Sequence, residues 1–225
     1  MSLNDARLND ARLNDARRFR AVAWDIDGTL IDSEPLHHRA LLTICGELGA
    51  DLSDLPDQAF CGTHIRDVWK ILRPRLPEST VEAEWIAAIN RFYVENRAEL
   101  MLLPGAVATI RTLAGRGVAQ ACVSNSSRRV VDANIDALGI ADKLAFSISL
   151  DDVEHGKPNP EPYARACARL GLPPDQVVAV EDSLAGARAA RAAGLHVIGY
   201  GSAAFDDIDH AIEAIDQVLA LFPPA

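Results

Sequence analysis

Two pairs of acidic residues stand directly after short apolar runs of the chain. Asp25 and Asp27 follow the first run, and Glu181 with Asp182 follows a later one. Residues one position apart on an extended segment lie on the same side, so Asp25 and Asp27 can act on one bound group. Clustered carboxylates repel one another and hold a hard cation such as Mg²⁺ through oxygen ligands. One carboxylate of such a set can attack while another transfers a proton.

Hydrogen-bond donors and a cation follow two further apolar runs. Ser124 and Asn125 come after one run, and Lys157 stands in a Gly-Lys-Pro loop after another. A lysine and a group of hydroxyl and amide donors suit a dianionic phosphoryl group. Gly28 allows the chain to turn sharply after Asp27, and Thr29 then offers a hydroxyl and a backbone amide to the same place. The combination predicts a phosphoryl-transfer site.

The elements that must position these residues alternate in type. Helices are expected at 106–114, 128–138, 160–170, 184–193 and 208–221, and strands at 20–24, 118–123, 145–149, 177–180 and 196–199. Such alternation predicts an α/β fold with a doubly wound parallel sheet covered on both faces. Ligands of these sheets bind at the carboxyl ends of the strands, where the acidic pairs, Ser124 and Lys157 stand.

The segment at 34–103 is different in character. Its apolar residues have helical spacing, prolines interrupt it, and no good strand is visible. The aromatic residues of the segment fall at helical spacing, which predicts that they form its core: Trp69, Trp85, Phe92 and Tyr93. We therefore expect a small helical domain inserted into the α/β domain.

Composition excludes several classes of protein. The 225 residues are 49% hydrophobic and 24% charged, an ordinary globular balance. A net charge of −10 repels a phosphate backbone, so nucleic acid is not an expected partner. No apolar run approaches the roughly 20 residues of a membrane span, and no signal-peptide pattern is present, so we expect a cytoplasmic protein that does not enter a membrane.

The cysteines and the first residues carry no functional expectation. Cys45, Cys61, Cys122 and Cys167 lie far apart, which predicts reduced and mostly packed thiols without a zinc site. The sequence Leu-Asn-Asp-Ala-Arg occurs three times within residues 1–18, and its five-residue period matches no helix face or solenoid repeat. We treat this segment as a low-complexity leader.

The four chemically active segments together carry a family resemblance. DIDGTL at 25–30, SN at 124–125, GKPNP at 156–160 and EDSLAG at 181–186 resemble the four motifs of the haloacid dehalogenase superfamily, in their usual order. The insert resembles the helical cap of the phosphatase and β-phosphoglucomutase-like branch. This resemblance implies a Rossmann-like core domain at 19–32 and 105–225 and a cap domain at 33–104.

The resemblance also implies a role for each motif residue. Asp25 would attack phosphorus and form an aspartyl-phosphate, and Asp27 would act as general acid and base. Mg²⁺ would be held by Asp25, the backbone carbonyl of Asp27, Asp182 and, directly or through water, Glu181. Lys157 and Mg²⁺ would offset the repulsion between nucleophile and phosphate. The phosphoryl group would be bound by Thr29, Ser124, Asn125 and Lys157.

The implied activity is hydrolysis of a small phosphorylated metabolite, with a sugar phosphate as the expected substrate. The cap would select it, and the candidate residues are His37, His38, His64, Arg66 and Lys70. A hexose phosphate phosphomutase is the alternative, because His37 stands ten residues after Asp27 as in β-phosphoglucomutase-like proteins. Against it, Arg66 stands one residue later than the mutase-like Gly-x-x-Arg pattern would place it. A phospho-accepting regulatory domain is a third reading, which the helical insert disfavours.

Overall fold

The computed structural model describes residues 19–56, 59–60, 63–201 and 206–224. The Leu-Asn-Asp-Ala-Arg repeats, Cys61 and Gly62 lie outside these residues. The chain forms two compact units. The helical unit is Asp32–Met101, and the remaining residues, up to Ile31 and from Leu102 onward, form the sheet unit.

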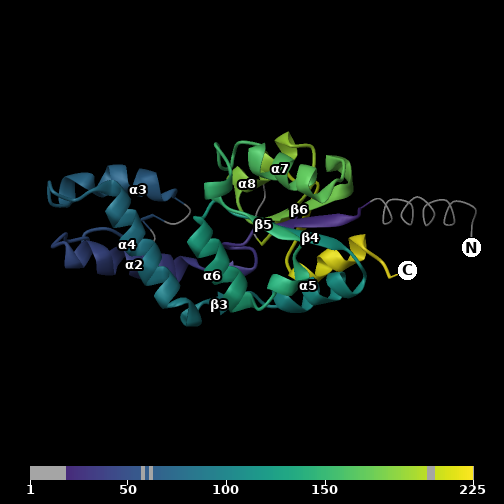
Figure 1. Ribbon diagram of the computed structural model, residues 1–225, viewed down its shortest axis with the longest axis horizontal. Coiled ribbons are helices and arrows are strands. Elements are labelled where there is room, and N and C mark those ends of the chain that lie inside the picture. Colours follow the sequence, from purple (N-terminus) through teal and green to yellow (C-terminus); the bar gives the residue numbers. More distant parts are fainter. Residues whose placement is uncertain (1–18, 57–58, 61–62, 202–205, 225) are drawn as a thin grey trace, which may run out of the picture. The chain divides into compact units, whose positions relative to one another are not determined.

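The sheet unit contains a six-stranded parallel sheet in the order β5-β4-β1-β6-β7-β8 (Figure 1). The central strands β1 and β6 are buried at every residue, as expected for a parallel strand covered on both faces. The expected α/β fold with a doubly wound parallel sheet is therefore confirmed. The strands are β1 (Ala21–Trp24), β4 (Ala119–Val123), β5 (Phe146–Ile148), β6 (Val177–Glu181), β7 (His196–Tyr200) and β8 (His210–Ile212).

Helices cover both faces of this sheet (Figure 1). On one face α7 packs on β1 and β4, and α8 packs on β6 and β7. The side chains of α8 that face the sheet are small, which permits a close approach of helix to strand. On the other face lie α5 and α6. The helices are α5 (Ala106–Gly115), α6 (Arg128–Leu138), α7 (Glu161–Leu170) and α8 (Leu184–Ala192), with short 3₁₀ turns at Ala141–Lys143, Leu150–Asp152 and Pro174–Gln176.

The helical unit has a hydrophobic core of its own. The rings of Trp69 and Trp85 lie 5.3 Å apart at its centre, and Tyr93 is fully buried. Phe92 packs on the same cluster from a partly buried position. The expectation that these aromatic residues form a core is thus confirmed. The unit contains α2 (Glu34–Glu47), α3 (Ile65–Leu72), α4 (Glu82–Glu95) and 3₁₀ turns at Arg73–Arg75 and Arg97–Glu99.

Two short strands lie where the chain passes between the units. They are β2 (Ile31–Asp32) and β3 (Met101–Leu102), which pair as a two-stranded sheet. The expectation that 34–103 holds no strand overlooked β3, because a two-residue strand is too short to produce an alternating pattern.

The expected C-terminal helix at 208–221 is wrong. The segment forms β8 at the sheet edge, followed by a 3₁₀ helix at Ile215–Leu221. Asp209 directs this outcome, because its backbone N–H donates to the carbonyl of Val197 and its carboxylate accepts from the Val197 N–H. Residues whose apolar spacing favours a helix therefore pair with the edge of β7. Tertiary pairing overrides the local pattern here.

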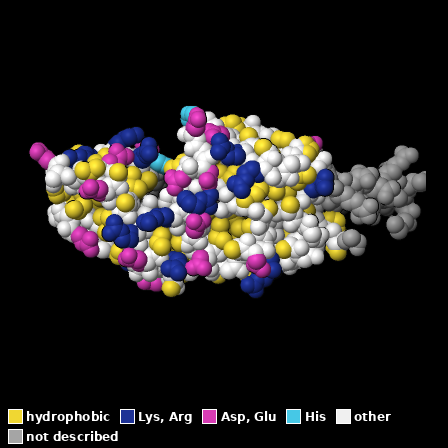
Figure 2. All heavy atoms as spheres, viewed as in Figure 1, with side chains coloured by type: hydrophobic (Ala, Val, Ile, Leu, Met, Phe, Trp, Pro, Cys, Tyr) yellow, Lys and Arg dark blue, Asp and Glu magenta, His cyan; other side chains and the backbone are white. Residues whose placement is uncertain are grey.

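The surface and the thiols carry little specific signal. Basic and acidic side chains are interspersed over the face shown in Figure 2. Cys45, Cys122 and Cys167 are buried free thiols, as expected for these three. Among the described helices, none has both the length and the apolar character needed to cross a lipid bilayer.

Candidate active site

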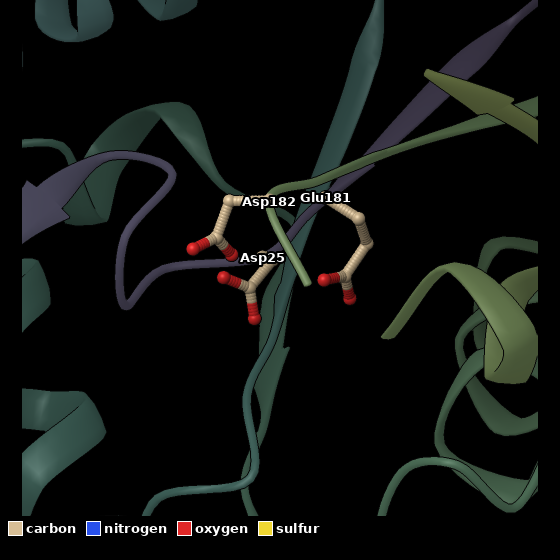
Figure 3. Close-up of side chains that lie close together, drawn as sticks. All are labelled: Asp25, Glu181 and Asp182. Atoms are coloured by element: carbon tan, nitrogen blue, oxygen red, sulfur yellow. The ribbon is translucent and has the colours of Figure 1, made fainter. Parts of the chain in front are cut away.

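The strand ends bring the acidic residues of the sequence together. Trp24 of β1 pairs with Val180 of β6, so the next residues, Asp25 and Glu181, lie at the same level of the sheet. The Asp25 N–H donates to the Val180 carbonyl at 3.0 Å, which holds Asp25 beside β6 after β1 has ended. Figure 3 shows Asp25, Glu181 and Asp182 gathered at this edge of the sheet. Carboxylate oxygens of the three residues lie within 4.8 Å of one another.

Lys157 lies among these carboxylates although it comes from a separate loop. Its Nζ donates to Asp25 Oδ1 and to Glu181 Oε1, each at 2.6 Å, and to the Val123 carbonyl at 2.8 Å. Burial lowers the pKa of Lys157, but the charges of Asp25 and Glu181 outweigh it and raise the pKa above the ordinary lysine value. The ammonium group is therefore a permanent positive charge beside the candidate nucleophile.

One lysine does not balance the negative charge of the site. Burial, together with the charge of Glu181, raises the pKa of Asp25 to about 7. Burial and the charge of Asp25 raise the pKa of Asp182 to about 7. Burial also raises the pKa of Glu181. The single charge of Lys157 is therefore too little to offset the burial and mutual repulsion of three carboxylates.

The residues present fit a divalent cation. Asp25 Oδ2 is buried and accepts no hydrogen bond from any residue that the structure describes, whereas Oδ1 binds Lys157. A buried carboxylate oxygen without a donor is costly unless a cation satisfies it. Asp182 stands next to it, with Oδ1 accepting from the Thr29 hydroxyl at 3.3 Å. Oxygen donors of this kind bind Mg²⁺ in preference to softer metals.

Glycines make room for the acidic side chains at two points. Gly28 has a φ of +84°, and a Cβ at this position would lie 2.0 Å from Asp182 Oδ2. A Cβ on Gly186 would lie 1.9 Å from Glu181 Oε2. The turn after Asp27 and the first turn of α8 therefore approach the site more closely than any residue with a side chain would allow.

Three donors hold the carboxylate of Asp27. Oδ2 accepts from the hydroxyls of Ser124 and Ser126, each at 3.0 Å. Oδ1 accepts from the side-chain amide of Asn134 at 3.1 Å. The sequence analysis assigned Ser124 to the phosphoryl group and not to Asp27, and it named neither Ser126 nor Asn134 as a site residue. The signal for Asn134 was its place as a polar residue on the apolar face of α6.

The Asn125 side chain binds the backbone of the loop that carries Lys157. Its Nδ2 donates to the Lys157 carbonyl at 2.9 Å, and its Oδ1 accepts from the Lys157 N–H at 2.7 Å. This pair of hydrogen bonds fixes the backbone that presents the ammonium group. The predicted contact of Asn125 with phosphate stays a prediction, and the side-chain amide is already engaged with the Lys157 backbone.

Tyr163 is a further site residue that sequence reasoning missed. It is fully buried on α7, donates its hydroxyl to Glu181 Oε1, and lies under the Lys157 ammonium, which is 5.2 Å from the ring centroid. Glu181 also accepts from the Ser183 hydroxyl at 3.3 Å. With donors from Lys157, Tyr163 and Ser183, Glu181 is held chiefly by protein groups.

The candidate specificity residues all belong to the helical unit. His37 stacks on Tyr93 with a centroid distance of 4.2 Å. His64 caps α3, its Nδ1 accepting from the Arg66 N–H at 3.3 Å, and burial lowers its pKa. Lys70 pairs with Asp67 at 2.7 Å on an exposed face. A cavity of about 290 Å³ within the unit has His38 in its wall.

The chain is similar to known proteins over most of its length. Residues 19–194 match the haloacid dehalogenase-like hydrolase family. Hexitol phosphatase A of Escherichia coli (strain K12) is 28% identical over 214 residues, which cover 92% of this chain and 96% of that protein. The plasmid phosphoglycolate phosphatase of Cupriavidus necator is 29% identical over 218 residues, 91% of this chain and 94% of that protein.

A solved structure extends the similarity to the fold. A variant of CbbY from Rhodobacter sphaeroides, in complex with xylulose-(1,5)bisphosphate, superimposes with a TM-score of 0.80 at 26% identity. The match covers 91% of this chain and 100% of that one. The family resemblance of the four motifs is confirmed: the chain belongs to the haloacid dehalogenase-like hydrolase family.

Proposed function

We propose that the protein is a Mg²⁺-dependent phosphatase that hydrolyses a small phosphomonoester through an aspartyl-phosphate on Asp25. The observation that carries the proposal is the state of the Asp25 carboxylate. One oxygen is bound by Lys157, and the other is buried with no donor among the described residues. A carboxylate placed in this way, at a strand end lined by further carboxylates, is suited to a cation and a phosphoryl group together.

The reaction divides into two displacements. In the first, a carboxylate oxygen of Asp25 forms a bond to phosphorus while the bond from phosphorus to the ester oxygen breaks, and Asp27 gives its proton to the departing alkoxide. In the second, a water attacks the aspartyl-phosphate, Asp27 takes a proton from that water, and inorganic phosphate leaves. Asp25 and Asp27 return to their starting forms.

The charges around Asp25 make this chemistry possible. Lys157 lies 2.6 Å from Asp25 and neutralises part of the repulsion between an anionic nucleophile and an anionic ester. Asp25, Asp182 and the backbone carbonyl of Asp27 would hold Mg²⁺, with Glu181 acting directly or through water. When bound, the cation supplies charge stabilisation for the oxygens of the transferring group. Ser124, Thr29 and the Asn125 N–H would contact the phosphoryl oxygens.

A sugar phosphate is the substrate that we propose. The relatives named above include a hexitol phosphatase, and the similar CbbY structure contains a sugar bisphosphate. The helical unit would act as the cap over the site. His37, His64, Arg66 and Lys70 would contact the part of the substrate that leaves, since groups brought down by a cap contact the leaving group.

The test is a screen for phosphate release over a panel of hexitol, pentose, hexose and two-carbon acid phosphates. Each substrate is assayed with Mg²⁺ and with a chelator. We expect release from at least one sugar or sugar-alcohol phosphate, loss of release with the chelator, and loss by more than about a thousand-fold in Asp25→Asn, because the nucleophile is removed. Asp216→Asn, an exposed substitution of the same kind outside the site, is the matched control and keeps full activity.

Three outcomes separate the alternatives. Turnover by Asp25→Asn close to that of the parent would reject Asp25 as nucleophile. Interconversion of hexose phosphates that needs a sugar bisphosphate, without net phosphate release, would identify a phosphomutase. Stable phosphorylation of the protein without turnover would identify a phospho-accepting regulatory domain.

A further inference from the structure

A buried amide lies where an apolar side chain would be expected. Asn134 is in the second turn of α6 and has no exposed surface. The other buried residues of this helix are apolar: Val130, Val131, Ala133, Ile135 and Leu138. An amide in such a face lowers the stability of the fold unless it forms hydrogen bonds, and residues that break a local rule in this way concentrate at functional sites.

The contact that Asn134 makes complements those of the two serines. Ser124 and Ser126 both donate to Asp27 Oδ2, whereas Asn134 donates to Oδ1. Rotation of an aspartate carboxyl group about its last bond is soft. The two serine hydroxyls restrain this rotation through one oxygen only. The Asn134 amide holds the second oxygen and thereby sets the plane of the carboxyl group.

The helix that carries Asn134 is itself anchored to the strand ends. The N–H of Arg128, the first residue of α6, donates to Asp151 Oδ2 at 2.8 Å. The Arg128 guanidinium donates to the Ser147 hydroxyl at 2.7 Å and to the Ser147 carbonyl at 3.2 Å. Since Ser147 belongs to β5, the amide is presented from a helix tied to the sheet, and a group on a rigid element is held with precision.

We propose that Asn134 is a positioning residue for proton transfer: it fixes the orientation in which Asp27 delivers its proton to the leaving group. The inference rests on the proposed function, in which Asp27 is the general acid. The inference gives a role in catalysis to a residue of α6 that lies outside the four motifs.

Leaving groups of different basicity provide the test. The value of kcat/KM reports the steps up to the first irreversible one, here transfer of the phosphoryl group to Asp25. An alkyl phosphate needs a proton at its leaving oxygen, whereas acetyl phosphate and p-nitrophenyl phosphate release stable anions without one. Misplacement of Asp27 should therefore reduce kcat/KM for the alkyl ester selectively.

Asn134→Leu removes the donor while keeping the number and branching of the side-chain heavy atoms. We expect its kcat/KM to fall about ten-fold for the best alkyl phosphate of the screen and to stay within about two-fold for the two activated esters, a part of the 10²–10⁴ that a general acid contributes. Asn134→Asp keeps the size but turns a donor into an acceptor, so it should show the same selectivity with a larger loss. Asp27→Asn removes the general acid itself and so gives the largest selective fall in kcat/KM for the alkyl phosphate.

A matched control separates positioning from stability. Gln120 is another buried amide, which accepts from the Trp24 indole at 3.0 Å and donates to the Ile110 carbonyl at 2.9 Å, away from the acidic cluster. Gln120→Leu should lower the melting temperature without distinguishing alkyl from activated esters. Equal losses on both ester classes in the folded Asn134 variants, or no loss, would overturn the inference while leaving the proposed function intact. Absence of phosphate release by the parent from every ester would instead overturn the proposed function, and the inference with it.

Discussion

In the proposed mechanism the Asp25 carboxylate must be buried to exclude water and ionised to attack phosphorus. Its surroundings have opposite effects on its ionisation. Lys157 stabilises the ionised form, but burial and Glu181 prevail and raise the pKa to about 7. Asp182 is in the same position, with burial and Asp25 raising its pKa to about 7. Between pH 3.8 and about 7, without a cation, both groups therefore bind more protons in the folded protein than in the unfolded chain.

The pH dependence of stability follows from these shifts. Each of these carboxyl groups has a pKa of about 7 in the folded protein and 3.8 in the unfolded chain. Its protonation stabilises the fold fully below pH 3.8, and this stabilisation is lost as the pH rises through about 7. A bound divalent cation favours the ionised forms, so we expect the rise in melting temperature on adding Mg²⁺ to be larger at about pH 8 than at about pH 6. Thermal unfolding with Mg²⁺ or with a chelator measures this. Asp182→Asn should reduce the rise, and an equal rise at both pH values would contradict the expectation.

The turn between β1 and β2 shows how an element serves the site. The chain leaves β1, passes Asp25 and Asp27, and reverses at Gly28, whose N–H donates to the Ile31 carbonyl at 2.8 Å. The positive φ of Gly28 and its close approach to Asp182 each require a residue without a side chain. One concerns the backbone and the other concerns the space that the acidic cluster needs.

Substitution of Gly28 tests both demands against a control. Gly117 has a φ of +75°, close to the +84° of Gly28, but a Cβ there would meet no atom within 4 Å. Alanine at either position should cost about 1–2 kcal/mol of stability through the left-handed backbone. Only Gly28→Ala should also raise the Mg²⁺ concentration for half-maximal activity, by about ten-fold, because it displaces Asp182. A normal Mg²⁺ requirement in Gly28→Ala would contradict the role of Asp182.

Elements with a clear apolar pattern could be predicted, whereas the edge strand β8 and the side-chain contacts of the site could not. The α6 prediction at 128–138 agrees with the structure because apolar periodicity and flanking residues define that helix locally. The helix expected at 208–221 was wrong because hydrogen bonds to the edge of β7, and not the apolar spacing of the segment, decide the conformation of β8. The contacts of Asn134 with Asp27 and of Tyr163 with Glu181 span 107 and 18 positions, and no spacing rule relates such residues.

At the scale of the molecule, the two units contain separate hydrophobic cores. One core is built on β1, β6 and the helices α7 and α8, and includes Ile148. The other is built on α2, α3 and α4 of the helical unit, and includes Leu72. Both side chains are fully buried.

Cores that do not share residues should respond separately to damage. Leu72→Ala and Ile148→Ala each remove a buried aliphatic side chain, at a cost of about 2–5 kcal/mol. We expect calorimetry to show that Leu72→Ala lowers the unfolding transition of the helical unit, while Mg²⁺ still stabilises the sheet unit that holds the acidic cluster. A single transition that shifts equally in both variants would show that the two cores unfold together.

The burial of the Lys157 ammonium has a practical consequence. The lysines of the chain are Lys70, Lys143 and Lys157. Their side chains are 73%, 34% and 4% exposed, respectively. Amine-directed dyes or surface-coupling reagents should therefore attach at Lys70 and Lys143 and spare Lys157 in the native protein. Amine chemistry should therefore leave unmodified the charge that the proposed mechanism places beside Asp25.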